Sequence, residues 1–189
     1  LQAGLSEDAE LMSCYVGDNL KDFHAITASG AMRYVWSADE RAALLPSGVE
    51  DEYEAFNEVL HGTNKVHAKK AKDLRTLAKT VNFGSAYSCE APKMQEMLIT
   101  DLETATAMLT AKRAKFWRYE QWKEEVEADA LNKGYSRTLL GARRHLEAVI
   151  RSDNKWDRQK AARQASNFMI QAAGVELIKK AMSRLWQSS

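Results

Sequence analysis

One short stretch of the chain places two cations and then two aromatic side chains at steps of four residues. These are Arg75, Lys79, Phe83 and Tyr87. A step of four on an α-helix passes a full turn by about 40°, so the four side chains would form one slowly drifting stripe. Fixed cations bind a triphosphate and flat rings stack on a base, so the stripe predicts a nucleotide site. The alternative is a solvated basic face that runs into a core-packed aromatic end.

A second polar stripe lies in the last quarter of the chain. Arg163, Asn167 and Gln171 are again spaced by four, which places them on one helical face. Guanidinium and amide groups form hydrogen bonds with base edges, sugars and phosphates. An ordinary polar helix face would show the same spacing.

The segment 133–145 is β-prone and punctuated by glycines, which predicts a short hairpin. It contains four Arg or Lys residues, among them Arg143 and Arg144, and no acidic residue. When the window is extended to residue 163, it contains nine bases and three acids. This charge suits a phosphate backbone.

A single histidine, His24, follows Asp22 in the segment 22–28. A lone histidine is more often a packed side chain or part of a helix cap.

The elements that must position these groups are mostly helices. The chain contains two prolines and is rich in Ala, Leu, Glu, Lys and Met, so we expect helices near 7–16, 22–33, 50–60, 65–87, 92–99, 101–130 and 157–187. The expected fold class is mainly α with a small β-hairpin. Gly84 inside a helix suggests close approach of another backbone or a ligand. In the helix 101–130, we expect the aromatic residues to pack in the core: Phe116, Trp117, Tyr119 and Trp122.

Composition sets the broad class. The 189 residues have a net charge of +1, but residues 1–64 carry 12 acids and 3 bases whereas residues 65–189 carry 14 acids and 24 bases. The basic part is where a polyanion would bind. The two cysteines have neither zinc-site spacing nor the pattern of a disulfide framework, so no metal site is expected in this chain. Neither a membrane span nor a signal peptide is found, and we expect a cytoplasmic protein of a bacterium or phage-infected host, with an organelle as an alternative.

Four segments together resemble the family A DNA polymerases, those similar to bacterial DNA polymerase I. The run R-x-x-x-K-x-x-N-F-G-x-x-Y at 75–87 matches the fingers helix of that family, and D-x-H-x-x-T-A at 22–28 matches a second segment. The hairpin is similar to G-Y-x-x-T-x-x-G-R-R, and R-x-x-x-N-x-x-x-Q at 163–171 resembles the helix that contacts the primer-template. Three departures stand out: Ser88 where the family has Gly, Ala142 inserted before Arg143, and A-A-G-V-E at 172–176 where the family has G-T-A-A-D.

The resemblance covers residues 5 to 181 and implies the fingers subdomain with flanking palm helices of a right-hand polymerase. By that analogy residues 1–23 belong to the palm, 24–160 to the fingers, and 161–189 to the palm again. The implied function is template-directed nucleotidyl transfer from a dNTP to a primer 3′-hydroxyl.

The resemblance also implies the role of each site residue. His24, Arg75 and Lys79 would bind the phosphates of the dNTP, with Lys79 and Arg75 acting in catalysis as the fingers close. Phe83 would lie against the sugar and base, and Tyr87 would stack near the templating position. The primer-template would be bound by a basic and polar set: Arg143, Arg144, Arg163, Asn167 and Gln171.

Catalysis in this family uses two Mg²⁺ ions held by two palm aspartates. The segment 5–12 resembles the stretch directly after the first aspartate motif, and the H-D-E triplet with the second is not found in the sequence, so the ligands would lie outside this chain. We therefore expect the chain to be inactive alone and to work with the rest of the polymerase, in cis or as a separate chain. The alternatives are a noncatalytic nucleic-acid-binding protein and one subunit of a split polymerase.

Overall fold

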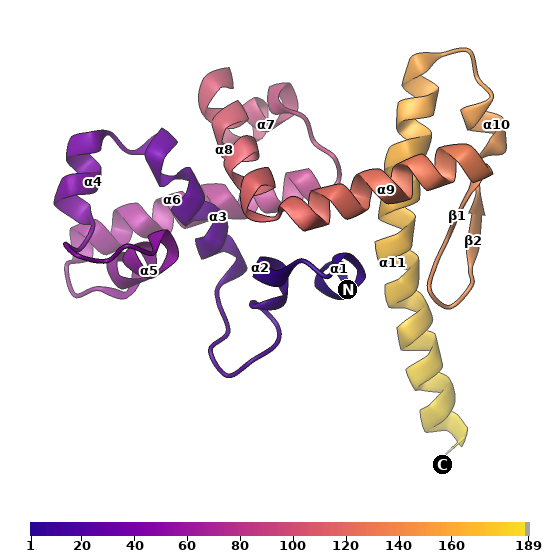
Figure 1. Cartoon of the computed structure of the whole chain (residues 1–189), viewed down its shortest axis with the longest axis horizontal. Coiled ribbons are helices and arrows are strands. Elements are labelled where there is room, and N and C mark those ends of the chain that lie inside the picture. Colours follow the sequence, from indigo (N-terminus) through magenta and orange to yellow (C-terminus); the bar gives the residue numbers. More distant parts are fainter. Residues whose placement is uncertain (188–189) are drawn as a thin grey trace. The chain divides into compact units, whose positions relative to one another are not determined.

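A computed structural model describes residues 1–187 as mainly helical, with one two-stranded antiparallel hairpin (Figure 1). The helices and strands have these bounds: α1 Gln2–Ser6, α2 Ala9–Met12, α3 Phe23–Val35, α4 Ala38–Leu44, α5 Glu52–His61, α6 Lys65–Ala86, α7 Ala91–Leu98, α8 Leu102–Lys115, α9 Trp117–Lys133, β1 Tyr135–Arg137, β2 Arg143–His145, α10 Glu147–Ile150 and α11 Lys155–Gln187. The expected fold class, mainly α with a small hairpin, is confirmed.

The chain forms two compact units. One contains Ala9–Trp117, and the other contains Leu1–Asp8 together with the chain from Arg118 onward. Each has its own packing. Helices α2 to α8 therefore make up the first unit, and α1, the hairpin, α10, α11 and nearly all of α9 make up the second.

Helix α3 is the centre of the unit that spans residues 9–117 (Figure 1). It packs against α5, α6 and α8. Eight consecutive residues of α3, from Ala25 to Met32, are buried, so the helix is covered on all sides rather than along one stripe. Small residues dominate this run, which lets the neighbouring helices approach closely.

Polar residues start several helices of this unit by accepting hydrogen bonds from free backbone N–H groups. Asp22 caps α3, and Asn64 caps α6 through Val66 and His67. Helix α4 begins with a reciprocal capping box between Ser37 and Glu40. These caps fix where α3 and α6 begin, which sets the register of every side chain further along them.

In the other unit, the hairpin pairs Tyr135 with His145 and Arg137 with Arg143, and β1 packs against α11. The Ser136 hydroxyl donates to the carbonyl oxygen of Ala165 at 3.1 Å, which ties the strand to the helix. Ala130, Leu146 and Ala165 form a small buried core in this unit, and Ile150 packs against it. The basic hairpin is therefore held against α11.

Two of the expected helices are wrong in extent. Of the helix expected over 7–16, only α2 forms, and α1 ends at Ser6 because Glu7 adopts a left-handed conformation with φ 55°. The helix expected over 101–130 ends at Lys115 and restarts at Trp117, because Phe116 leaves helical geometry at φ −113° and ψ 48°. Helix α4 was not expected, although its S-x-x-E capping box is readable in the sequence.

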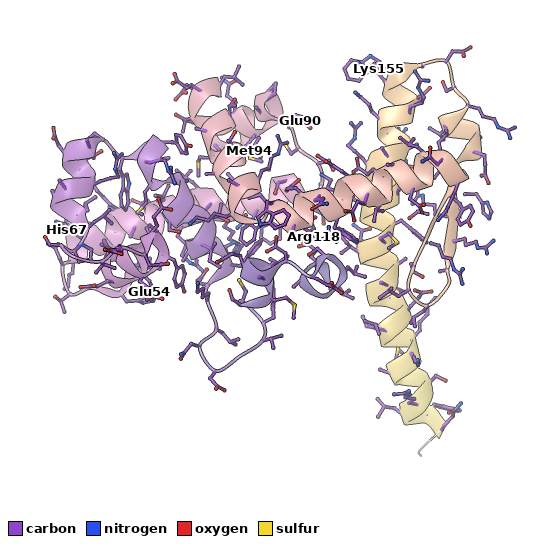
Figure 2. The ribbon with its side chains drawn as sticks, in the orientation of Figure 1. Glu54, His67, Glu90, Met94, Arg118 and Lys155 are labelled. Carbon is purple, nitrogen blue, oxygen red and sulfur yellow. The ribbon has the colours of Figure 1, made fainter. Side chains whose placement is uncertain are left out.

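Two packing expectations also need correction. Phe116, Tyr119 and Trp122 are buried, but Trp117 is 63% exposed. A Cβ added at Gly84 would lie 2.7 Å from Cε of Met94, the α7 residue labelled in Figure 2. The group that approaches Gly84 is therefore a methionine side chain, not another backbone or a ligand.

Candidate functional site

Helix α6 carries the stripe of cations and aromatics along one side. Arg75 is half-buried and Lys79 is exposed. Phe83 and Tyr87 are 55% and 61% exposed, so the aromatic end is not packed in a core. Large exposed rings next to cations are available to a ligand, which is the arrangement that a base and its phosphates require.

The end of α6 is fixed by a Schellman motif. Cys89 N–H donates to the Gly84 carbonyl at 3.0 Å, and Ser88 N–H donates to the Ser85 carbonyl at 2.9 Å. Ser88 therefore adopts the left-handed conformation, with φ 57°. That geometry favours glycine, which accounts for the glycine that the family carries here and makes Ser88 a strained substitute.

Arg75 is held by an acid at the start of α3. Its Nη2 and Nε lie 2.6 and 2.9 Å from Oδ2 of Asp22. The other oxygen of Asp22 accepts from the N–H groups of His24 and Ala25 at 2.8 and 3.0 Å. One carboxylate thus caps α3 and neutralises Arg75, and this brings the two predicted phosphate ligands Arg75 and His24 to the same place.

A second link joins α3 to α6 below the surface. The Thr27 hydroxyl donates to Oδ1 of Asn82 at 2.9 Å. The amide nitrogen of Asn82 lies 3.0 Å from Nδ1 of His24. Thr27 and Asn82 are buried, whereas His24 is half-buried.

The ring of His24 and the ring of Phe83 are 6.2 Å apart, and Nζ of Lys79 lies 5.9 Å from the centre of the Phe83 ring. His24, Arg75, Lys79 and Phe83 therefore form one cluster. Tyr87 lies beyond it at the C-cap of α6, with no ring contact to the cluster among the described residues. The structure brings together four of the five residues predicted to bind the dNTP.

The charged groups around the cluster shift the pKa values of His24 and Asp22. Partial burial lowers the pKa of His24, and the cations Arg75 and Lys79 lower it further, against the opposing effect of Asp22. For Asp22, partial burial opposes ionisation, but the hydrogen bonds from Arg75 and from the α3 backbone hold its pKa below the usual value. At neutral pH the cluster is thus a neutral imidazole beside an ionised carboxylate and two cations.

The residues predicted to bind DNA lie in the other unit. The Arg143 guanidinium lies 5.0 Å from the centre of the Tyr135 ring, and Arg144 donates to Oε1 of Gln164 at 3.3 Å. Both arginines are exposed on β2. Glu176 accepts from Ala142 N–H at 3.2 Å, so the residue inserted before Arg143 contacts the acid of the departing A-A-G-V-E segment.

Arg163, Asn167 and Gln171 all lie within α11, which confirms their helical spacing. Arg163 and Asn167 are half-buried and Gln171 is exposed. Two buried small residues lie between Arg163 and Asn167: Ala165 contacts the hairpin and Ser166 contacts Glu127. The predicted polar face therefore lies beside the residues that anchor the basic hairpin.

Three residues that connect α3 and α6 at the cluster have no role assigned from the sequence patterns: Asp22, Thr27 and Asn82. They are fixed letters of the D-x-H-x-x-T-A and K-x-x-N-F-G patterns. Their place in these patterns is the sequence feature that could have marked them as residues of the site. No pairwise contact between residues 55 apart follows from the spacing within either pattern.

The described residues contain no cluster of side chains suited to Mg²⁺. In residues 1–187 no group of three or more His, Cys, Asp or Glu residues is placed to hold a metal ion. The acid of the cluster, Asp22, is already bonded to Arg75 and to the start of α3. None of the described helices combines the length and the apolar character needed to cross a membrane.

The sequence of this mainly helical chain matches a known protein family. The family model described as DNA polymerase family A matches residues 48–188. The chain belongs to DNA polymerase family A.

Individual relatives are also DNA polymerases. The chain is 33% identical over 116 residues to the thermostable DNA polymerase I of Thermus aquaticus, covering 60% of this chain and 14% of that protein. It is 33% identical over 144 residues to DNA polymerase I of Mycobacterium tuberculosis strain H37Rv, covering 72% of this chain and 16% of that protein. The chain thus spans only a small part of the curated relatives it matches.

A solved structure is also similar. The POL domain of Pol1 from M. smegmatis, in complex with a DNA primer-template and dNTP, matches with a TM-score of 0.71 and 26% identity. The match covers 99% of this chain and 27% of that chain. The fold described above is therefore that of part of a polymerase domain.

Proposed function

We propose that this chain is the dNTP-binding and primer-template-binding part of a template-directed DNA polymerase. The observation that carries the proposal is the cluster on α3 and α6. Two cations, an imidazole and an exposed ring lie together there, on the residues that match the patterns of the family. In the complete polymerase the reaction is nucleotidyl transfer from a dNTP to a primer 3′-hydroxyl.

Each group has a role that follows from its chemistry. Arg75 and Lys79 neutralise the triphosphate, and Lys79, which is exposed, is suited to donate a proton to the departing pyrophosphate. His24 donates a hydrogen bond to a phosphate oxygen. Phe83 lies against the sugar and base, and Tyr87 stacks near the templating position. Two Mg²⁺ ions bound outside this chain would supply the charge stabilisation of the transfer step.

In the other unit, we propose that a basic and polar surface binds the primer-template. Phosphate contacts come from Arg143 and Arg144, and Arg163, Asn167 and Gln171 follow the groove and backbone. We keep the division into palm (1–23), fingers (24–160) and palm (161–189) as a proposal about function. It need not coincide with the packing units.

The test compares two lysines of α6. Lys79→Ala removes a proposed phosphate ligand, whereas Lys70→Ala removes an exposed lysine about two and a half turns earlier, on the opposite side of the helix, where it pairs with Glu40 at 2.6 Å. Both variants lose one positive charge. Lys79→Ala should weaken dATP binding by about tenfold or more and leave primer-template affinity unchanged.

Lys70→Ala should bind dATP like the parent. In the polypeptide that carries the palm aspartates, Lys79→Ala should also lower the turnover of primer extension by about tenfold or more. Equal dATP affinity in the two variants would contradict the nucleotide site. DNA binding without any dATP binding by the parent would favour a noncatalytic nucleic-acid-binding protein.

A further inference from the structure

Three side chains connect the interior of the unit to the imidazole of the cluster. Thr27 on α3 lies 2.9 Å from Oδ1 of Asn82 on α6, and the amide nitrogen of Asn82 lies 3.0 Å from Nδ1 of His24. Thr27 is 0% exposed and Asn82 is 4% exposed. The relay is therefore protected from water up to the half-buried ring at its end.

The direction of each hydrogen bond determines the next one. A hydroxyl that donates to Oδ1 fixes the amide, so that its NH₂ group faces His24. An amide nitrogen can only donate, and Nδ1 of His24 must therefore accept. A neutral imidazole whose Nδ1 accepts carries its proton on Nε2.

The opposite arrangement gives the hydroxyl of Thr27 a longer hydrogen bond. If the amide of Asn82 were turned over, its nitrogen would face Thr27 and the hydroxyl would have to donate elsewhere. The remaining acceptor for Thr27 is the carbonyl oxygen of Phe23, at 3.4 Å. The 2.9 Å contact would persist, with the amide nitrogen donating to Oγ1 of Thr27, but the hydroxyl hydrogen would have only this longer contact. In the recorded orientation the same hydrogen has Oδ1 of Asn82 as its acceptor at 2.9 Å.

The charged groups around the ring act together with this relay. Asp22 lies on the same helix as His24, and Arg75 and Lys79 lie on α6. Two cations and one carboxylate disfavour a third positive charge at His24. A proton on Nδ1 would in addition face the NH₂ group of Asn82. In residues 1–187 Nε2 has no hydrogen-bond partner, so its N–H is available.

We propose that Asn82, itself oriented by Thr27, is a positioning residue that holds His24 as the neutral Nε2–H tautomer, so that the ring presents a hydrogen-bond donor to a nucleotide phosphate. The phosphate in this statement rests on the proposed function. The assignment of the tautomer rests only on the hydrogen bonds of this chain. Asn82 acts through His24 and touches no reacting atom.

The experiment reads the tautomer directly. Two-dimensional ¹⁵N–¹H spectra of the chain labelled in its histidines distinguish Nδ1–H, Nε2–H and imidazolium forms. The parent should show His24 as Nε2–H at pH 7.5. In Asn82→Asp, a side chain of the same size, the carboxylate can only accept, so His24 should change to Nδ1–H or to the imidazolium form.

The matched control is Asn64→Asp on the same helix. Asn64 caps α6 by accepting from Val66 and His67, and Asp is an equally good cap, so this variant repeats the chemical change without touching the relay. It should leave the spectrum of His24 unchanged. Thr27→Val removes only the orienting hydroxyl and should give a mixture of the two neutral tautomers.

Addition of dATP with Mg²⁺ then separates the two proposals. In the parent, dATP should shift the Nε2 signal of His24, and Thr27→Val should weaken dATP binding by about threefold without a change of charge. A parent His24 in the Nδ1–H form, or Asn82→Asp with unchanged Nε2–H, would overturn the role of Asn82, even if dATP binds. A different result would overturn the proposed function and the phosphate role but not the hydrogen-bond relay. In that result the tautomers are as predicted, dATP does not shift the His24 signal, and Lys79→Ala and Lys70→Ala have equal dATP affinity.

Discussion

The guanidinium of Arg75 lies 2.6 Å from the carboxylate of Asp22, and that carboxylate also caps α3. In this state the arginine proposed to bind the triphosphate is already neutralised. A triphosphate must share Arg75 with Asp22 or displace it, and either event changes the contact between the start of α3 and the middle of α6. The ion pair therefore links nucleotide binding to the packing of two helices.

Asp22→Asn tests this link. Asn is as good a helix cap as Asp, so the change removes the negative charge and keeps the start of α3. Binding of dATP should become about threefold tighter because a repulsive carboxylate is gone, whereas the free energy of unfolding should fall by less than about 1 kcal/mol because the pair is about one third exposed. Dye-displacement titration and urea unfolding measure the two effects.

The control for this variant is Asp51→Asn. Asp51 caps α5 by accepting from Glu54 N–H at 2.9 Å, so this variant makes the same change at the cap of another helix. It should leave dATP affinity unchanged. If both variants bind dATP equally tightly, the carboxylate of Asp22 does not compete with the triphosphate.

His24 gives the chain a predicted dependence of stability on pH. Its folded pKa is lowered, so the unfolded state binds more protons as the pH falls below the unfolded pKa of about 6.5. Stability is therefore full above that pH and is lost as the pH falls through the folded pKa. The urea midpoint of the parent should fall between pH 7.5 and 5.5, and His24→Gln should lose part of that slope.

His67→Gln is the matched control for the pH series, because His67 is half-buried, like His24, and lies on the first turn of α6. It should retain the slope of the parent. If His67→Gln removes the slope and His24→Gln does not, the pH dependence comes from His67 and the prediction for His24 is wrong. Asp22, whose pKa is also lowered, should act only below about pH 4.

Ser88→Gly should stabilise the chain. Ser88 has φ 57° and its buried hydroxyl oxygen has no hydrogen-bond partner, so glycine removes both the strain and the unpaired group. We expect a gain of about 1 kcal/mol in the free energy of unfolding, after the larger entropy of glycine in the unfolded chain is subtracted.

Ser85→Gly is the contrasting change, three residues earlier. Ser85 lies inside α6 and its hydroxyl donates to the carbonyl of Asn82 at 3.1 Å, so glycine should cost about 1 kcal/mol. Thermal or urea unfolding of both variants gives the comparison. Loss of stability in both would show that Ser88 is not strained.

Arg163→Ala should weaken binding of a primer-template. Arg158→Ala is the control, because it removes the same charge from α11 more than one turn earlier, at an exposed position on another side of the helix. Fluorescence anisotropy with a labelled hairpin primer-template at several salt concentrations measures both. If Arg163 contacts a phosphate, its loss should reduce the slope of log affinity against log salt by about 0.9. Equal losses in the two variants would indicate only a general effect of charge.

The fixed letters of the sequence determined the family, the mainly helical fold and the residues of the stripe. Spacing along one helix is enough to place Arg75, Lys79 and Phe83 on one side of α6, because helical geometry is local. Caps are local as well, and the box of Ser37 and Glu40 is readable from the sequence alone.

Only the tertiary structure decided which residues from different helices meet. The pairing of Asp22 with Arg75, and the relay from Thr27 through Asn82 to His24, join residues more than fifty positions apart. Such contacts depend on how α3 packs on α6, which no periodicity within either helix specifies. The break at Phe116 and the exposure of Trp117 have the same origin, because a local pattern of aromatic residues does not say which ring the packed helices will cover.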